Sequence, residues 1–137
     1  MRFEILLVED NPMDVELVRE ALACWEVPAH VNVVEDGDEA MRFLRNCGHR
    51  SPSLILLDLN LPKKSGVEVL TEIKGDPELS EIPVIVLTTS DREMDVKRAY
   101  RLHANCYITK PLEIAEFMSK IKAIEQFWLQ HARLPRN

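Results

Sequence analysis

The sequence lacks long apolar runs, an excess of basic residues and closely spaced cysteines. No stretch approaches the roughly 18 consecutive apolar residues of a membrane-spanning helix, and the first ten residues do not form a secretory signal. The net charge is −6, from 17 basic and 23 acidic residues, which argues against DNA and anionic membranes as partners. The three cysteines form no C-x-x-C pair, so we expect reduced structural thiols in a cytoplasmic protein.

The sequence also has little glycine, with 4 residues in 137, and it contains no repeat, low-complexity segment or Gly/Ser linker. Nothing in the composition therefore divides the chain, and its length suits one domain. Only residues 131–137 differ, because they are polar and mildly basic. We expect one domain over residues 1–130 and a short tail over residues 131–137.

Five short apolar runs alternate with segments of helical length. The runs are Phe3–Val8, Val31–Val34, Leu54–Leu57, Val84–Leu87 and Cys106–Ile108. The third and fourth runs are continuously apolar, which is typical of strands covered by helices on both faces of a parallel sheet. The alternation predicts an α/β protein with a three-layer (βα)5 architecture, a doubly wound parallel five-stranded sheet of the flavodoxin-like class.

Several predicted helices carry recognisable start signals. Asn11 followed by Pro12 is typical of a helix N-terminus. Residues 65–68 and 90–93 both fit the capping-box pattern, in which a serine and a glutamate bind the first free N–H groups of a helix. In the fourth helix, the helical spacing predicts one buried stripe made of Val96, Ala99, Tyr100 and His103.

Polar side chains that suit a cation or a phosphoryl group follow four of the predicted strands. They are Glu9 and Asp10 after the first strand, Asp58 after the third, Thr88 after the fourth and Lys110 after the fifth. Ligands of open parallel sheets bind at this carboxyl edge. Carboxylates crowded there repel one another, and a divalent cation together with one lysine would relieve the repulsion. Oxygen ligands suit Mg²⁺, and we expect Asp58, alone after an apolar strand, to accept a phosphoryl group.

Four segments carry a resemblance to a known family. They are Val8-Glu9-Asp10-Asn11, Leu56-Leu57-Asp58-Leu59-Asn60-Leu61-Pro62, Val86-Leu87-Thr88-Thr89 and Tyr107-Ile108-Thr109-Lys110-Pro111. Through them the chain resembles the receiver domain of two-component response regulators over nearly its whole length. It is most similar to the stand-alone regulators of cyanobacterial and bacterial phytochromes, in residues 102–111 and in the Phe-Trp-Leu run at 127–129.

The resemblance implies a set of roles around the phosphoryl group. Asp58 would accept it from the phosphohistidine of a sensor histidine kinase, and the closer similarity points to a phytochrome as that kinase. Mg²⁺ would be surrounded by Glu9, Asp10, Asp58 and the backbone carbonyl of Asn60. Lys110 would pair with Asp58 or with the phosphoryl oxygens.

The resemblance also implies a switch. Thr88 would donate a hydrogen bond to the phosphoryl group, and Tyr107 would turn inward when Thr88 moves. The peptide bond between Lys110 and Pro111 is expected to be cis. His103 stands where many receivers have glycine, and histidine tolerates a left-handed backbone better than β-branched residues do.

Two other functions suit this topology. A phosphatase or dehalogenase with an aspartate nucleophile would need a second aspartate two residues after Asp58, and Asn60 is there instead. A flavin-binding module would need a phosphate-binding loop after the first strand, where the segment from Glu9 to Pro12 is acidic. We therefore expect a signalling switch, not a metabolic enzyme. Its output would be by protein contact, because after Pro111 one helix and a tail leave no room for a DNA-binding domain.

The last helix predicts a surface for self-association. Its apolar stripe at helical spacing consists of Ile114, Phe117, Met118, Ile121, Ile124 and Trp128. Phe127 falls roughly 110° from the centre of this stripe if each residue advances about 100°. An aromatic side chain outside the core stripe favours an interface. We expect a homodimer through the face made by the fourth helix, the fifth strand and the fifth helix.

Overall fold

The computed structural model describes residues 3–48 and 51–135. Strands and helices alternate along the chain. The strands are β1 (Phe3–Val8), β2 (Ala29–Val34), β3 (Leu54–Leu57), β4 (Val84–Thr88) and β5 (Cys106–Thr109). The helices are α1 (Pro12–Ala23), α2 (Gly37–Asn46), α3 (Gly66–Gly75), α4 (Glu93–Arg101), α5 (Ile114–Ile124) and the π-helical segment η2 (Glu125–His131).

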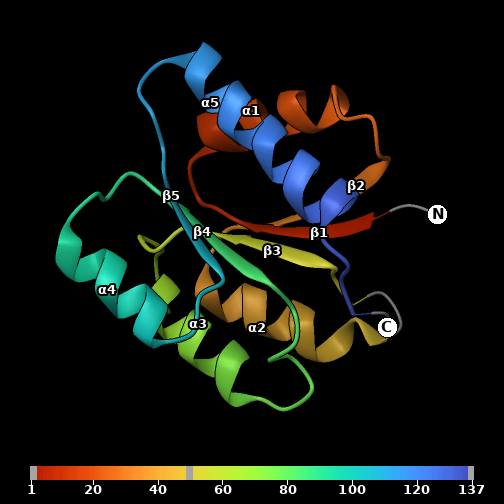
Figure 1. The fold of residues 1–137 in the computed structure, drawn as a ribbon. Helices are drawn as coiled ribbons and strands as arrows, with labels where there is room; N and C mark the ends of the chain where they lie inside the picture. The colour runs from red at the N-terminus through yellow and green to blue at the C-terminus, as the bar shows by residue number, and fades with distance from the viewer. Residues whose placement is uncertain (1–2, 49–50, 136–137) are drawn as a thin grey trace.

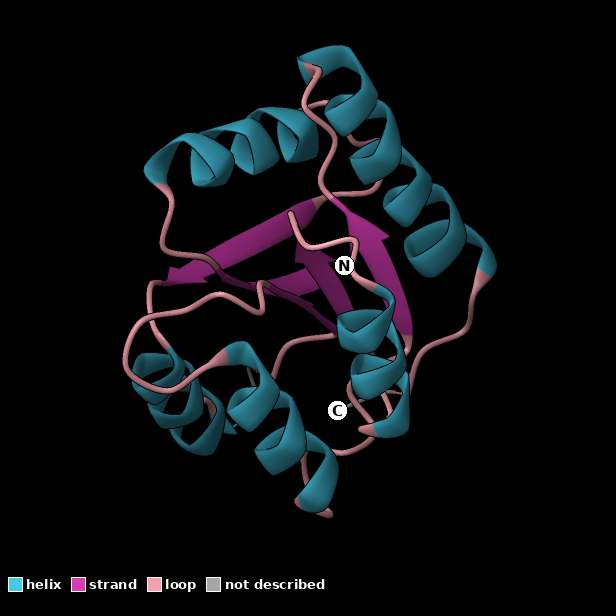
Figure 2. Cartoon of the chain, turned by 90° about the vertical axis from the view of Figure 1, so that its left-hand side faces the viewer, coloured by secondary structure: helices cyan, strands magenta, loops and turns pink. Residues whose placement is uncertain are grey.

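The strands form one parallel sheet in the order β2-β1-β3-β4-β5. Helices α1 and α5 cover one face, and α2, α3 and α4 cover the other (Figures 1 and 2). This arrangement confirms the predicted three-layer, doubly wound (βα)5 fold. Because all strands run in the same direction, their carboxyl ends meet at one edge of the sheet.

The sheet is buried between two apolar layers. Residues of β3 and β4 are buried throughout, as their continuous apolar runs predict. One layer packs side chains such as Leu6 and Ile55 against α2 and α3, and the other packs Ile5 and Leu56 against α1 and α5. Strand β5 lies at the edge of the sheet, and its side chains are only partly buried.

The helix start signals are confirmed for α1 and α3 and wrong for α4. The side-chain oxygen of Asn11 accepts a hydrogen bond from the backbone N–H of Met13, and Ser65 Oγ accepts one from the N–H of Glu68. Helix α4 has no side-chain cap, because it begins after Arg92 and not after Ser90. Ser90 Oγ accepts the N–H of Arg92 at 3.5 Å and donates to Asp95 Oδ2 at 2.5 Å. The capping pattern at 90–93 is therefore used to tie the preceding loop to the helix.

The predicted buried stripe of α4 is also wrong, because only Ala99 in this helix is buried. The side chain of Tyr100 is 47% exposed, and His103 is exposed as well. Helix α4 covers the edge strand β5, so most of its surface faces solvent (Figure 1). The backbone at His103 is left-handed, with a φ of 73°.

The last helix departs from its predicted stripe at both ends. Ile114, its first residue, is 63% exposed. From Glu125 the helix widens into π-helical turns, so that Glu125 and Leu129 are buried, whereas Trp128 is only partly buried. The buried Glu125 carboxylate accepts hydrogen bonds from the N–H of Val27 at 2.7 Å and from Lys122 Nζ at 2.6 Å. This contact holds η2 against the segment that precedes β2.

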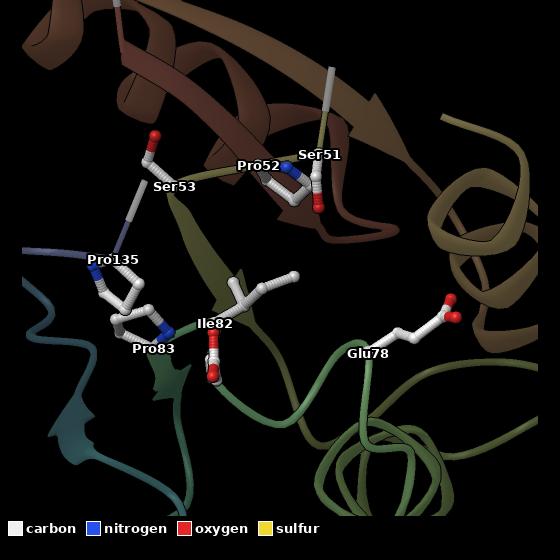
Figure 3. Close-up of a pocket in the computed structure, with 8 residues that line it drawn as sticks. Ser51, Pro52, Ser53, Glu78, Ile82, Pro83 and Pro135 are labelled. Carbon is white, nitrogen blue, oxygen red and sulfur yellow. The ribbon is translucent and has the colours of Figure 1, made fainter. Parts of the chain in front are cut away.

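After η2 the chain returns to the amino-terminal ends of the central strands. Pro135 lines a small pocket there with Ser53 and Pro83, at the start of β3 and β4 (Figure 3). This pocket lies at the edge of the sheet opposite the predicted site. The predicted tail over 131–137 extends beyond this point, and residues 136–137 lie outside the described residues. None of the helices in the described ranges is long and apolar enough to cross a membrane.

Candidate functional site

The residues predicted to form the site lie at the carboxyl ends of four neighbouring strands. Glu9 and Asp10 follow β1, Asp58 follows β3, Thr88 ends β4, and Lys110 follows β5. The sheet order places these strands side by side. Backbone hydrogen bonds align the strand ends, because the N–H of Asp58 donates to the carbonyl of Val8 at 3.1 Å and that of Lys110 to the carbonyl of Thr88 at 2.7 Å.

Three carboxylates form a cluster that can hold a cation. Glu9, Asp10 and Asp58 each offer one oxygen, and these oxygens lie within 4.8 Å of one another. Glu9 and Asp58 are buried, whereas Asp10 is exposed. Hard, negatively charged oxygen ligands with one side open to water fit a divalent cation such as Mg²⁺. The side chains present therefore suit the metal that the resemblance implies.

Crowding and burial change the titration of Glu9. Burial raises the pKa of Glu9 from 4.5 to about 7, because the charged form loses its hydration. The hydrogen bond from Lys110 opposes this shift, and the negative charge of Asp58 adds to it. A cation bound between Glu9 and Asp58 would neutralise two buried negative charges, so it would be held strongly.

Hydrogen bonds fix both oxygens of Asp58. Its Oδ1 accepts one from Thr88 Oγ1 at 2.9 Å and one from the backbone N–H of Asn60 at 3.0 Å. Its Oδ2 accepts one from Lys110 Nζ at 3.2 Å. The hydroxyl of Thr88 thus already lies on the carboxylate that is expected to carry the phosphoryl group. The Asn60 peptide lies beside the cluster, and the role of its carbonyl remains a prediction.

Lys110 is the buried positive charge of the site. Its ammonium donates to carboxylate oxygens of Glu9, Asp14 and Asp58. Burial alone would lower the pKa of Lys110, but the hydrogen bonds to Asp14 and Glu9 and the nearby negative charges raise it above its ordinary value. Lys110 is therefore a fixed positive charge at any physiological pH.

The sequence analysis missed Asp14 as a member of the site. Asp14 lies in the first turn of α1, and its Oδ2 accepts a hydrogen bond from Lys110 Nζ at 2.8 Å. The topological rule that groups Glu9, Asp58 and Lys110 applies to residues directly after strands. Helix α1 starts four residues after β1 ends, so an acid in its first turn is also close to the carboxyl edge. That proximity is the signal that could have identified Asp14.

Tyr107 lies on β5 and contacts the loop that follows Thr88. Its hydroxyl donates a hydrogen bond to the backbone carbonyl of Ser90 at 2.8 Å. Burial raises the pKa of the Tyr107 phenol, so the hydroxyl keeps the proton that it donates. The expected cis bond before Pro111 is wrong, because the described residues contain no cis peptide bond. The backbone hydrogen bond from Lys110 to Thr88 already directs this segment to the site.

Phe127 is not part of this site. Its segment η2 is held at Val27, before the start of β2, and therefore lies toward the opposite edge of the sheet. The side chain of Phe127 is 55% exposed and packs edge-on against Trp128, with ring centroids 5.2 Å apart. Its predicted position outside the core is confirmed.

Comparisons with known proteins agree with this geometry. A family model described as the response regulator receiver domain matches residues 5–122. The chain is 48% identical over 135 residues to the response regulator Rcp1 of Synechocystis sp., in an alignment that covers 96% of this chain and 92% of Rcp1.

Two solved structures are similar over nearly their whole length. The crystal structure of the phosphorylated cyanobacterial phytochrome response regulator RcpA has a TM-score of 0.95 and 52% identity, covering 98% of this chain and 99% of that one. The Mn²⁺-bound form of Rcp1 has a TM-score of 0.91 and 47% identity, covering 97% and 99%.

Receiver domains are signalling proteins that interact with histidine kinases and bind a divalent metal in an acidic pocket. The cluster of Glu9, Asp10 and Asp58 is such a pocket. The sequence match, the fold and the strand-end site lead to one assignment. The chain belongs to the response regulator receiver domain family, as a relative of Rcp1 and RcpA with a phosphoryl-acceptor role in two-component signalling.

Proposed function

We propose that the chain is a single-domain response regulator in which Asp58 accepts a phosphoryl group from the phosphohistidine of a sensor histidine kinase. The metal is Mg²⁺, held by Glu9, Asp10, Asp58 and the backbone carbonyl of Asn60. Residues 1–130 make the receiver domain, and residues 131–137 make a short tail. The protein acts in the cytoplasm without DNA or a membrane as partner.

The convergence of groups on the Asp58 carboxylate carries this proposal. Thr88 Oγ1, the backbone N–H of Asn60 and Lys110 Nζ all donate to it, at 2.9, 3.0 and 3.2 Å. Phosphoryl transfer depends on positioning and on charge neutralisation more than on covalent help from the protein. The hydrogen bonds position the Asp58 carboxylate, and the positive charge of Lys110 and the hydroxyl of Thr88 can neutralise the incoming negative charge.

The reaction then follows from these positions. A carboxylate oxygen of Asp58 attacks phosphorus while the bond from phosphorus to the kinase imidazole nitrogen breaks, and the imidazole retains that electron pair. Lys110 and Thr88 stabilise the negative charge that arrives with the phosphoryl group. A bound Mg²⁺ supplies further neutralisation of the phosphoryl oxygens.

Tyr107 links this event to the surface. Its hydroxyl bonds the carbonyl of Ser90, two residues after Thr88, so a displacement of Thr88 also moves the group that Tyr107 contacts. Strand β5 and helix α4 adjoin this loop. We therefore place the output on the face made by α4, β5 and α5, which signals by protein contact.

Two features support the partners that we propose. The similarity to RcpA, a cyanobacterial phytochrome response regulator, supports a phytochrome as the kinase. Exposed aromatic side chains support a homodimer, because such side chains are enriched in interface cores. Tyr100, which is 47% exposed, lies on α4 of the α4-β5-α5 face, and Phe127, which is 55% exposed, lies in η2 directly after α5.

An aspartate-nucleophile phosphatase is the alternative. Such an enzyme needs an acid two residues after its nucleophile, and Asn60 presents only its backbone N–H to Asp58. This absence of a general acid favours the receiver.

The experiment compares phosphorylation of wild type and Asp58→Asn by acetyl phosphate, with Mg²⁺ and with chelator. We expect label on the wild type with Mg²⁺ only and none on the variant. Asp76→Asn is the matched control, because Asp76 accepts the N–H of Glu78 at 2.9 Å at the far end of α3 and an asparagine oxygen can do the same. Equal label on Asp58→Asn, or label that survives chelation, would contradict the proposal.

A further inference from the structure

All three N–H donors of the Lys110 ammonium are used by carboxylates from three different elements. Glu9 follows β1, Asp58 follows β3, and Asp14 lies on α1. An ammonium group has three donors and no acceptor, so these bonds fix its orientation completely. The Lys110 side chain is only 4% exposed, and the bonds to acids are of the strong charge-assisted kind.

Asp14 differs from the other two acids in its place. It is not a member of the cluster of Glu9, Asp10 and Asp58 that suits a cation. Its side chain is 21% exposed, and its backbone N–H faces the Asn11 side chain at the start of α1. The side chain of Asp14 therefore contacts Lys110 from helix α1 but does not belong to the cation cluster.

We propose that Asp14 is a positioning residue that, together with Glu9, anchors Lys110 so that its remaining donor points at the phosphoryl group on Asp58. The inference rests on the proposed function, because it takes Asp58 as the phosphorylated residue. When Asp58 becomes an acyl phosphate, one of its oxygens joins phosphorus and loses its charge. The N–H of Lys110 that donates to Asp58 Oδ2 can then donate to a phosphoryl oxygen. The hydrogen bonds from Lys110 to Glu9 and Asp14 need not change.

The physical gain is preorganisation. A free lysine side chain has to lose rotamer freedom when it binds the phosphoryl group, and this loss of entropy weakens binding. Two anchors from different elements remove most of this cost before the phosphoryl group arrives. Without Asp14, Glu9 is the remaining anchor, and the ammonium can rotate about its hydrogen bond to Glu9.

The test measures binding of trifluoroberyllate, a phosphoryl analogue, at saturating Mg²⁺ by calorimetry. It compares Asp14→Ala with Asp14→Asn, which remove the same charge. Only the asparagine keeps an oxygen that accepts a hydrogen bond from Lys110. The difference between the two variants therefore reports the anchor and is independent of charge. Thermal unfolding of both variants shows whether α1 is intact.

Glu16 supplies the matched control. It lies on the same helix and is exposed, and within the described ranges its side chain makes no hydrogen bond or ion pair. Glu16→Ala and Glu16→Gln repeat the loss of charge and the change in helix propensity without touching Lys110. We expect both to bind trifluoroberyllate as the wild type does.

We expect Asp14→Ala to bind trifluoroberyllate roughly three- to tenfold more weakly than Asp14→Asn, since immobilising one flexible side chain on binding costs about 1 kcal/mol. Equal affinities of the two Asp14 variants, or tighter binding by Asp14→Ala, would overturn the inference while the proposed function stands. Trifluoroberyllate bound by wild type but not by Asp58→Asn supports the proposed function separately. A wild type that binds none would overturn both.

Discussion

Glu9 is the side chain that gains most from a bound cation. It is buried beside Asp58, and burial raises its pKa to about 7, although Lys110 donates a hydrogen bond to it. A carboxylate must lose its proton before it binds a metal. Near neutral pH, the affinity of the site for a divalent cation therefore depends on the protonation state of Glu9.

We predict that Mg²⁺ binds about tenfold more weakly at pH 6 than at pH 8, because a group that titrates near pH 7 is mostly protonated at the lower pH. Calorimetry in two buffers with different ionisation enthalpies measures the affinity and the proton released. Glu9→Gln should bind Mg²⁺ more weakly and with little pH dependence. A wild-type affinity that is constant between pH 6 and pH 8 would contradict the prediction.

The raised pKa of Glu9 also determines how the stability of the metal-free protein changes with pH. The pKa of Glu9 in the folded protein lies above its value of 4.5 in the unfolded chain. The folded state therefore binds the proton more tightly, and the metal-free protein loses this contribution to stability as the pH rises from about 4.5 to 7. Mg²⁺ reverses the trend, because it binds the carboxylate form.

At the scale of elements, α3 is packed directly against the loop that carries Asp58. A Cβ added to Gly66, the first residue of α3, would lie 2.3 Å from the backbone carbonyl oxygen of Asp58 and 2.5 Å from the Cα of Leu59. Both neighbours are backbone atoms, which cannot rotate away. Gly75 ends the same helix, and a Cβ there would meet nothing within 4 Å.

We predict opposite effects for the same substitution at the two ends of α3. Gly66→Ala should lower the free energy of unfolding by about 2 kcal/mol or more, because it forces backbone apart in a packed region. Gly75→Ala should leave it unchanged or raise it by up to about 1 kcal/mol. Urea unfolding measures both values. Equal effects would show that α3 can shift away from Asp58 without cost.

At the scale of the whole molecule, the site and the proposed interface are connected through β5. Lys110 follows this strand and Tyr107 lies on it, with the hydroxyl of Tyr107 bonded to the Ser90 loop. Helix α4 packs against the same strand and exposes Met94 and Tyr100. We therefore infer that a change at Asp58 is transmitted to the α4-β5-α5 face through β5.

We predict that the wild type sediments as a homodimer when trifluoroberyllate and Mg²⁺ are present, and that Phe127→Ala weakens the dimer. Loss of an aromatic side chain from an interface core typically weakens association by about 2 kcal/mol or more. Analytical ultracentrifugation with and without the analogue measures both effects. Monomeric wild type under every condition would refute the dimer. An unchanged dimer in the variant would place the interface elsewhere.

The sequence alone was sufficient to predict the fold and most of the site. The apolar runs identified all five strands, with ends that differ by no more than two residues from those of the structure. A parallel sheet brings the ends of its strands to one edge, so residues directly after the strands could be grouped by topology alone. Glu9, Asp58 and Lys110 were found in this way, and the structure brings them together.

The side-chain contacts of the helices depend on how the helices pack in three dimensions. Asp14 contacts Lys110 because of the way α1 lies across the sheet, which local pattern does not specify. Ser90 fits a capping box, but its hydroxyl bonds Asp95. Glu125 looks like a surface acid, yet the π-helical turn buries it against Val27. The succession of strands and helices follows from patterns along the chain, whereas these contacts depend on packing between distant segments, where tertiary interactions outweigh local propensity.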